Sequence, residues 1–353
     1  MRTALIVCAA IVIGVAIAAF AILQHPAFGR KFTKERKEKI INSANYKNGQ
    51  FRNQIPTPQF TGNKSSLKAM WEFAFNQIQD INITPKDSLQ AIKTDIKSLS
   101  TNSDWIIWFG HSSYIFCLGG KKFLVDPVFD IQFPASIMMK PFKGTDIYSA
   151  QDMPYIDYLI ITHEHWDHLD YGTLKHLKDK VGTAICSLGV GEYLEYWGYK
   201  NIIEMDWYDS YTSPDNTLIT CLPSRHFSNR LIKRNQTLWA SFMVQNNNRK
   251  IYIGGDGGYD HRFKEINHSF GSVDLAILEN GQYNEDWAYI HTMPQDLEKV
   301  MLDLKAKNYL TVHHDKFALS KHAWNEPENI AKQIAEKDTL NLLDKPIGTI
   351  IHF

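Results

Sequence analysis

The chain has 353 residues, of which 44% are apolar, enough for one large domain or two small ones. Its 38 Lys and Arg residues balance its 38 Asp and Glu residues, which argues against a nucleic-acid-binding protein, so any electrostatic attraction must be local. The cysteines show no paired spacing, which favours free thiols over a disulfide framework. They are Cys8, Cys117, Cys186 and Cys221.

The chain begins with an uncharged apolar run from Ala4 to Leu23. As a helix this run would be roughly 30 Å long, about the thickness of a bilayer core. A cleaved signal peptide is the alternative, with a cleavage motif at residues 16–18, but the apolar run continues beyond that motif. We therefore predict an uncleaved transmembrane anchor over residues 1–25.

Basic residues follow this run between positions 30 and 39, whereas only the amino terminus and Arg2 precede it. Because positively charged flanks stay on the cytoplasmic side, we predict a membrane protein whose large domain faces the cytoplasm. The same basic stretch could rest on anionic lipid headgroups or form a solvated helix face, and the sequence leaves both interpretations open.

Residues 26–103 are predicted to connect the anchor to the main domain, with a loop over 50–64 and a short helix over 67–78. From residue 104 onward, short β-rich runs alternate with helical stretches, which favours a layered α/β domain over residues 104–353. One helix is predicted over 296–307, where apolar residues recur on one face. The predicted strands cover residues 105–109, 114–118, 122–125, 158–161, 251–253, 274–278 and 309–312.

A dense set of metal-ligand side chains follows the predicted strand at 158–161. His163, His165, Asp167 and His168 fall within six residues, and imidazole and carboxylate groups suit zinc and similar divalent metals. A solvated loop or ordinary core histidines are the alternative. The flanking apolar strand favours a metal site, because these groups are costly to bury together without a cation.

Single candidate ligands follow later strands. Asp256 comes after two glycines that allow a close backbone approach, His313 ends the strand at 309–312, and His226 lies in a loop. Each alone would more often be a turn or surface residue, but together with the first cluster they are candidate metal ligands. His111 and Asp126, each after a short strand, are predicted to orient the ligands, with a turn or core role as the alternative.

These motifs together resemble the metallo-β-lactamase superfamily, and more closely its group of N-acyl-phosphatidylethanolamine-hydrolysing phospholipases D. The resemblance covers residue 104 to the C-terminus and implies an αββα sandwich, here preceded by the predicted transmembrane helix. It rests on the His-x-His-x-Asp-His motif and on the segments Trp108–His111, Val125–Phe129, Ile161–Tyr171, Pro223–Phe227, Gly255–Tyr259 and His313–Leu319.

The resemblance implies two divalent metal ions, with zinc as the first expectation, and a bridging carboxylate between them. The ligands would be His163, His165 and His226 for one ion, Asp167, His168 and His313 for the other, and Asp256 for both. His313 is preferred over His314 because the family's ligand stands four residues before the Phe of a Phe-Ala-Leu motif, here Phe317.

The resemblance also places a substrate-contacting histidine at His291, with a helix-capping loop histidine as the alternative. Asp167 and His291 are therefore the residues expected at the reaction centre. The implied reaction cleaves N-acyl-phosphatidylethanolamine to N-acylethanolamine and phosphatidate. Its partners would be a membrane phospholipid and the bilayer, not nucleic acid, and the resemblance allows a homodimer. The segment from Phe133 to Met139 could be an apolar lip or could pack against the domain.

Two other functions stay open. One is a metal-dependent hydrolase of a soluble ester, lactone or phosphate, because one fold hosts many chemistries. The other is a non-catalytic metal-binding membrane protein. Seven ligands argue against that second function, because a closed structural zinc site needs only four.

Overall fold

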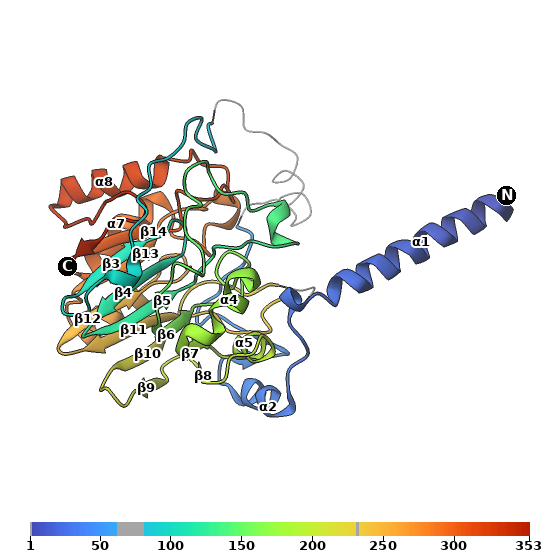
Figure 1. Ribbon diagram of the computed structural model, residues 1–353, viewed down its shortest axis with the longest axis horizontal. Helices are drawn as coiled ribbons and strands as arrows, with labels where there is room; N and C mark the ends of the chain where they lie inside the picture. The colour runs from blue at the N-terminus through green and yellow to red at the C-terminus, as the bar shows by residue number, and fades with distance from the viewer. Residues whose placement is uncertain (1, 62–80, 231–232) are drawn as a thin grey trace.

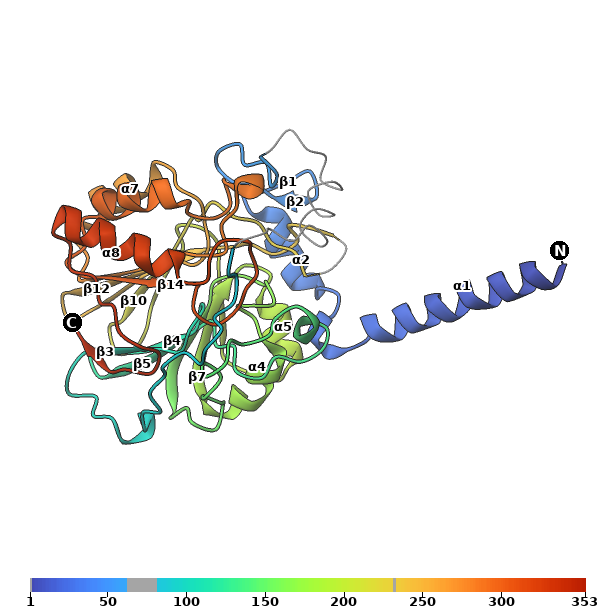
Figure 2. The ribbon, with the colours of Figure 1, turned by 90° about the horizontal axis from the view of Figure 1, so that it is seen from above.

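The computed structural model describes residues 2–61, 81–230 and 233–353, in which two β-sheets lie face to face between helices (Figure 1). Among these residues, the first sheet has seven strands in the order β15-β3-β4-β5-β6-β7-β8, and the second has six in the order β14-β13-β12-β11-β10-β9. Figure 2 shows α7 and α8 outside the second sheet and α4 and α5 outside the first. This arrangement confirms the predicted αββα sandwich.

Every predicted strand is present, and no predicted strand end is displaced by more than two residues. The first sheet contains β3 (Trp105–Trp108), β4 (Tyr114–Leu118), β5 (Lys121–Val125), β6 (Ile156–Ile161), β7 (Val181–Ser187), β8 (Ile202–Met205) and β15 (Ile351–His352). The second contains β9 (Ser210–Thr212), β10 (Leu218–Leu222), β11 (Ser241–Asn246), β12 (Arg249–Ile253), β13 (Leu275–Glu279) and β14 (Tyr309–Val312). A small hairpin pairs β1 (Tyr46–Lys47) with β2 (Gln50–Phe51).

The helix predicted over 296–307 begins two residues earlier, at Pro294, and ends at Leu304 because Lys305 adopts a left-handed conformation. The helix predicted over 67–78 lies outside the described residues. The described helices are α1 (Arg2–Leu23), α2 (Lys34–Asn42), α4 (Tyr171–Leu177), α5 (Gly191–Tyr196), α6 (Arg262–Phe270), α7 (Pro294–Leu304) and α8 (Glu326–Asp338). Short 3-10 turns are η1 (Pro26–Phe28), η2 (Ile96–Ser98), η3 (Ala135–Ile137), η4 (Lys178–Lys180) and η5 (Glu285–Trp287).

Three apolar cores separate the four layers. In β3, Ile106 points into the core between the two sheets, whereas Ile107 points into the core beneath α4 and α5. Successive strand residues face opposite sides, so a sheet buried on both faces needs apolar residues at every position. The third core lies between the second sheet and its helices and contains Leu297 and Met301 of α7. Both sheets are therefore buried on both faces and form a rigid scaffold for loops at their edges.

The N-terminal residues form helix α1, which extends away from the folded body (Figure 1). Within the part of the chain that the structure describes, no helix is both long enough and apolar enough to cross a membrane. The transmembrane anchor predicted over 1–25, and the cytoplasmic orientation inferred from its flanking charges, are therefore not supported.

Two of the basic residues after α1 bind the main domain. Arg36 of α2 is largely buried, and its guanidinium contacts Glu192 and Glu204 at 2.6 Å each and Glu195 at 2.9 Å. Arg30 adds a second contact to Glu192 at 2.5 Å. Neither the lipid-headgroup interpretation nor the solvated-face interpretation describes Arg36, because its charge is already paired within the protein.

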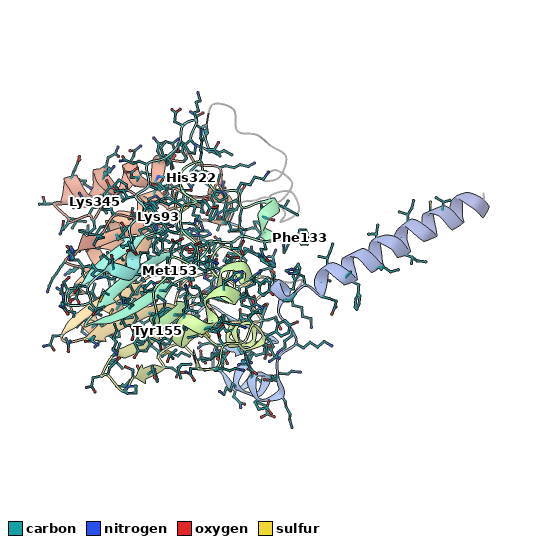
Figure 3. The ribbon with its side chains drawn as sticks, viewed as in Figure 1. Lys93, Phe133, Met153, Tyr155, His322 and Lys345 are labelled. Atoms are coloured by element: carbon teal, nitrogen blue, oxygen red, sulfur yellow. The ribbon has the colours of Figure 1, made fainter. Side chains whose placement is uncertain are left out.

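The apolar segment at 133–139 is partly exposed, as expected of a lip, and partly packed against the domain. Ile137 and Met138 are 64% and 67% exposed, whereas Met139 is buried against Val128 and Phe317. Figure 3 shows Phe133 at the side of the body from which α1 extends. The segment therefore forms an exposed apolar lip that is anchored by Met139.

Lys316 is a buried cation whose Nζ donates to the carbonyl oxygen of Val128 at 2.9 Å. Burial lowers the pKa of this amine to about 8, although Asp146 partly opposes the shift, whereas the ordinary value is 10.5. Between these two pH values the unfolded chain binds more protons than the folded one. The free energy of unfolding should therefore rise with pH, by up to about 1.4 kcal/mol per pH unit.

We expect Lys316→Met to abolish this rise, because methionine fills the same space without a charge. Guanidinium-induced unfolding of the wild type and of Lys316→Met at pH 8, 9 and 10 measures how the free energy of unfolding of each protein changes with pH. If the free energy of unfolding changed with pH equally in the two proteins, the Lys316 amine would have its ordinary pKa.

Candidate metal centre

The candidate ligands meet at one edge of the two sheets. In the first sheet β5 and β6 are parallel, and in the second β12, β13 and β14 are parallel. Parallel strands end at the same edge, where the connecting loops carry the polar residues. The loop after β6 carries His163 to His168, and Asp126, Asp256 and His313 follow β5, β12 and β14. A hydrogen bond from Ala240 N to Thr162 O, 3.1 Å long, connects the two sheets here.

A glycine makes the close approach at Asp256 feasible. Gly255 has a φ of 58°, and a Cβ at this position would lie 2.7 Å from the carbonyl oxygen of Ala240 and 3.2 Å from Thr162. The predicted close backbone approach is therefore to the opposite sheet, and it places Asp256 directly beside the loop after β6.

The first group of candidate ligands is formed by His163, His165, His226 and Asp256, each offering one atom within 4.8 Å of the others. Nδ1 of His165 lies 2.9 Å from Nε2 of His163 and 3.1 Å from Nε2 of His226. Burial lowers the pKa of His165 to about 4, and it lowers the pKa of the other two imidazoles well below the ordinary value. All three rings are therefore neutral at pH 7, the form that binds a metal.

The second group contains Asp167, His168 and His313, together with His111. Oδ2 of Asp167 lies 3.4 Å from Nε2 of His313 and 3.8 Å from Nε2 of His168. His314 lies outside this group, because its ring packs against Trp108 at a centroid distance of 4.8 Å. The structure thus places the first of the two adjacent histidines at the site.

One carboxylate oxygen lies between the two groups. Oδ2 of Asp256 is 3.8 Å from Nε2 of His163 and 3.7 Å from that of His226 in the first group. It is 3.2 Å from Nε2 of His168 and 3.3 Å from that of His313 in the second. Four imidazole nitrogens therefore surround a single buried carboxylate oxygen.

These distances suit divalent metal ions. A tetrahedral zinc ion with bonds of about 2.0–2.1 Å separates its ligand atoms by about 3.3–3.4 Å. Nε2 of His168 is buried and has no hydrogen-bond partner among the described residues, so it can bind a metal ion in place of a proton. Burial lowers the pKa of His168, but Asp256, Asp167 and Asp126 outweigh burial and raise it well above the ordinary value. Carboxylates that attract a proton so strongly also attract a metal ion.

Neighbouring groups fix the orientation of these imidazoles. Nδ1 of His226 donates to the carbonyl oxygen of Ile290 at 2.7 Å, which leaves Nε2 free to bind a metal. Nδ1 of His168 contacts Asp126 at 2.8 Å, and Asp126 also accepts from the backbone and hydroxyl of Thr162 at 2.9 and 2.6 Å. The structure thus places Asp126 where it was predicted to orient a ligand.

His111 contacts the site through Asp167, whose Oδ2 lies 2.8 Å from its Nε2. Burial, followed by the charge of His313, lowers the pKa of His111 to about 3, so the ring is neutral and this contact determines its tautomer. His111, Asp126 and His313 have φ values of 51°, 41° and 75°, in the left-handed region that side chains other than glycine rarely occupy. Three such residues at one site indicate backbone strain held by the surrounding fold.

The loop after β6 is held in place from behind. Arg230 is buried, and its guanidinium donates to the carbonyl oxygens of Glu164 and Leu169 at 2.9 and 2.8 Å. The same guanidinium lies 3.8 Å above the ring of Trp166. Glu164 points away from the metal groups, because its carboxylate accepts from the hydroxyl of Tyr193. Within the motif, therefore, Glu164 and Trp166 shape the loop while the histidines and Asp167 face the site.

His291 lies beside both groups. Its ring stacks on His313 at a centroid distance of 5.4 Å and meets His226 edge-on at 5.1 Å. The helix-capping alternative for His291 is wrong, because α7 has Met293 at its N-cap and no side-chain cap bond.

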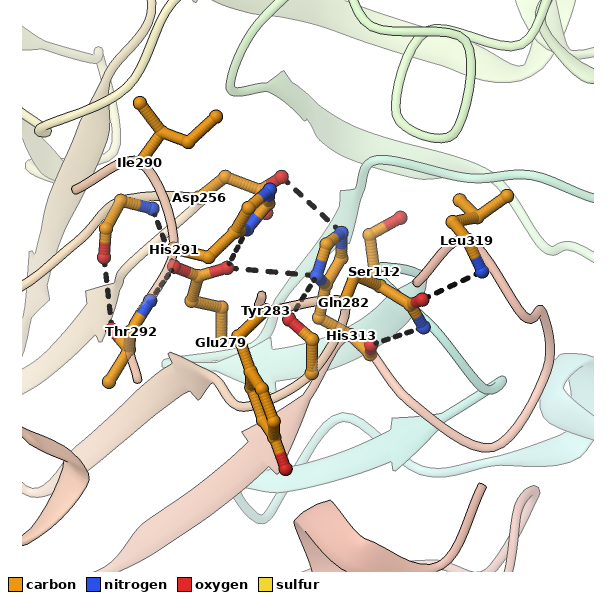
Figure 4. A network of polar contacts seen from close by, with 12 residues as sticks. Ser112, Asp256, Glu279, Gln282, Tyr283, Ile290, His291, Thr292, His313 and Leu319 are labelled. Atoms are coloured by element: carbon orange, nitrogen blue, oxygen red, sulfur yellow. Dashed lines mark hydrogen bonds and ion pairs between the residues drawn. The ribbon is translucent and has the colours of Figure 1, made fainter. Parts of the chain in front are cut away.

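Nδ1 of His291 contacts a residue that the motif analysis did not find, Glu279, at 2.7 Å (Figure 4). Glu279 ends β13, so the same signal that marked His313 and Asp256, a polar residue at a strand's carboxyl end, would have found it.

The sequence comparison agrees with this geometry. The model of the Beta-lactamase superfamily domain matches residues 121–314, which contain β5 through β14 and all seven predicted ligands. The chain belongs to the metallo-β-lactamase superfamily. With this fold and these ligand groups, it is a metal-dependent hydrolase of that superfamily, and divalent metal ions are its implied cofactor.

Two relatives and one solved structure show how far the likeness extends. An uncharacterized protein of Mycobacterium tuberculosis is 32% identical over 295 residues, which cover 81% of this chain and 78% of that protein. The mitochondrial N-acyl-phosphatidylethanolamine-hydrolyzing phospholipase D of Saccharomyces cerevisiae is 32% identical over 65% of this chain and 51% of its own length. The solved structure of a metallo hydrolase from the archaeon Ignicoccus hospitalis has a TM-score of 0.55 at 17% identity, covering 71% of this chain and 98% of that one. This last likeness shows the fold alone.

Proposed function

We propose that this chain is a binuclear metal phosphodiesterase of the phospholipase D type, which cleaves N-acyl-phosphatidylethanolamine to N-acylethanolamine and phosphatidate. The observation that carries the proposal is the position of Asp256, whose Oδ2 lies within 3.8 Å of imidazoles from both ligand groups. A carboxylate in that position can bridge two metal ions, and paired ions suit in-line displacement at phosphorus.

Three residues would hold each ion, with zinc as the first expectation for the metal. The ligands would be His163, His165 and His226 for the first ion and Asp167, His168 and His313 for the second, with Asp256 shared. When bound, the ions supply an activated water at neutral pH and offset charge on the phosphate. The chain itself supplies the imidazoles, an anionic bridge and the contacts of Asp126 and His111 that orient them.

His291 would act on the leaving group. Burial lowers the pKa of this imidazole, but the charge and hydrogen bond of Glu279 outweigh burial and raise it above the ordinary value. A protonated His291 can donate to the ethanolamine oxygen as its bond to phosphorus breaks. The water oxygen then remains on phosphatidate, and the proton from His291 leaves with N-acylethanolamine.

Two further observations support a lipid substrate. The yeast relative carries this activity in its name, although this chain covers only 51% of that protein. The exposed lip at residues 133–138 is joined to the metal loop, because Ala135 and Trp166 pack against the same small cluster around Val128 and Met139. Ile137 and Met138 therefore present apolar side chains on a segment that packs against the loop carrying four of the seven proposed ligands. We propose that this lip contacts the lipid surface from which the substrate is taken.

The test uses the full chain loaded with zinc and N-acyl-phosphatidylethanolamine in mixed micelles. Mass spectrometry in ¹⁸O-water should show N-acylethanolamine without label and phosphatidate with one labelled oxygen. Diacylglycerol in place of phosphatidate would show cleavage of the other phosphoester bond. Turnover of soluble phosphodiesters, esters or lactones without any lipid cleavage would overturn the lipid assignment and favour the soluble-substrate function.

A further inference from the structure

Glu279 is a buried carboxylate that has no place among the seven proposed ligands. It ends β13, is 4% exposed, and uses both oxygens (Figure 4). Its Oε1 accepts from the backbone N–H groups of Gly257 and Thr292 at 2.8 and 2.7 Å. Its Oε2 lies 2.7 Å from Nδ1 of His291 and 3.6 Å from Nδ1 of His313.

These contacts hold Glu279 from two sides. Gly257 directly follows Asp256 on the loop after β12, and Thr292 directly follows His291. The two backbone donors therefore fix the carboxylate between the loop that carries the proposed bridge and the loop that carries His291. A side chain held by two backbone N–H groups has little freedom to rotate, so its second oxygen occupies a defined position.

The chemistry of the contact places a proton on Nδ1 of His291. An ionised carboxylate only accepts hydrogen bonds, so Nδ1 of His291 must be the donor. Nε2 is then the nitrogen left for a substrate. The ring is further confined by stacking on His313 with an interplanar angle of 19°.

We propose that Glu279 is the positioning residue for His291: it accepts a hydrogen bond from Nδ1–H and so fixes the ring with Nε2–H, the proposed proton donor, toward the phosphoester. This inference rests on the proposed role of His291 in phosphodiester cleavage. In this role Glu279 acts through His291 and is not a ligand, although one atom each of Glu279, Asp256, His291 and His313 lie within 4.8 Å of one another.

Glu279→Gln tests this assignment with almost no change in shape. The amide oxygen can still accept from Gly257 and Thr292, but the amide nitrogen now faces Nδ1 and must donate to it. Nδ1 must then accept and give up its proton, which leaves a neutral ring that is a weaker acid at Nε2, while the loop contacts are kept. We expect kcat for the lipid to fall roughly 10- to 100-fold, with KM changing less than about twofold.

A double-mutant cycle separates positioning from a general structural effect. If Glu279 acts through His291, replacing Glu279 should not lower kcat any further in a protein that already carries His291→Ala. Additive losses, or loss of a metal ion from Glu279→Gln, would overturn the proposal and indicate a role through His313 instead. Glu192→Gln is the matched control, because Glu192 is equally buried but contacts Arg30 and Arg36. This control should lower stability and leave kcat unchanged.

A second readout does not depend on the substrate. ¹⁵N-imidazole NMR of the zinc-loaded protein, assigned with His291→Ala, should detect a proton on Nδ1 of His291 in the wild type and none on Nδ1 in Glu279→Gln. A proton on Nδ1 in both proteins would overturn the positioning role. If the Nδ1 proton is lost as expected but no lipid is cleaved, the proposed function fails while the inference about Glu279 stands.

Discussion

Replacing His165 with alanine should reduce hydrolysis by at least about 10³-fold and remove metal from the first ligand group. Nδ1 of His165 lies 2.9 Å from His163 and 3.1 Å from His226, so its loss opens one side of that group. Paired metal ions stabilise transition-state charge by several kcal/mol, and each 1.36 kcal/mol corresponds to a factor of ten in rate. Initial rates together with metal analysis by mass spectrometry measure both effects.

The matched control is His176→Ala, because His176 lies on α4 with its side chain about half exposed and, among the described residues, pairs only with Asp130, at 4.0 Å. This variant should keep both ions and the full rate. If His165→Ala bound two ions per chain and retained its rate, the first group would not be a metal site. Equal losses in both histidine variants would indicate a nonspecific effect on folding.

Replacing His291 with alanine should lower kcat for the lipid by roughly 10²- to 10⁴-fold, the range for loss of a general acid, while both metal ions remain bound. The metal content should not change because the seven proposed ligands do not include His291. The size of the loss should depend on the leaving group. A phosphodiester that releases nitrophenolate needs no proton at the departing oxygen, so its hydrolysis should be affected far less than that of the lipid.

The nitrophenyl diester serves as the control for the lipid, because both substrates are measured with the same His291→Ala variant. An equal loss for the lipid and the nitrophenyl diester would indicate that His291 binds the phosphate and does not protonate the leaving group. Unchanged rates for both would exclude His291 from the reaction centre. Loss of a metal ion would instead show that His291 is a ligand.

The location of the candidate site could be predicted from short segments of sequence. Apolar β-rich runs such as 114–118 and 309–312 identify buried strands within a window of a few residues, and polar residues directly after them identify a loop edge. The histidine-rich motif after residue 161 has this form, and so do Asp256 and His313. These signals are local, because strand propensity and burial depend mainly on the residues themselves.

Other strands gave no such signal. β9, Ser210–Thr212, is short and lies at the edge of its sheet, and its pairing with β10 determines its structure more than its own residues do. The N-terminal segment shows the same limitation. Counting basic residues suggested an orientation in a membrane, but Arg36 is paired with glutamates more than 150 residues away in the sequence.

The sequence alone therefore determined the sandwich fold, the motif and the identity of the candidate ligands. Only the tertiary structure gave the distances from Asp256 to both ligand groups, and only it showed that His111 contacts Asp167 and that Glu279 holds His291. The physical reason is that these contacts join loops from two sheets, and their distances depend on strand register and sheet packing. Register and packing are set by the whole core at once, whereas strand propensity is set by a few neighbouring residues.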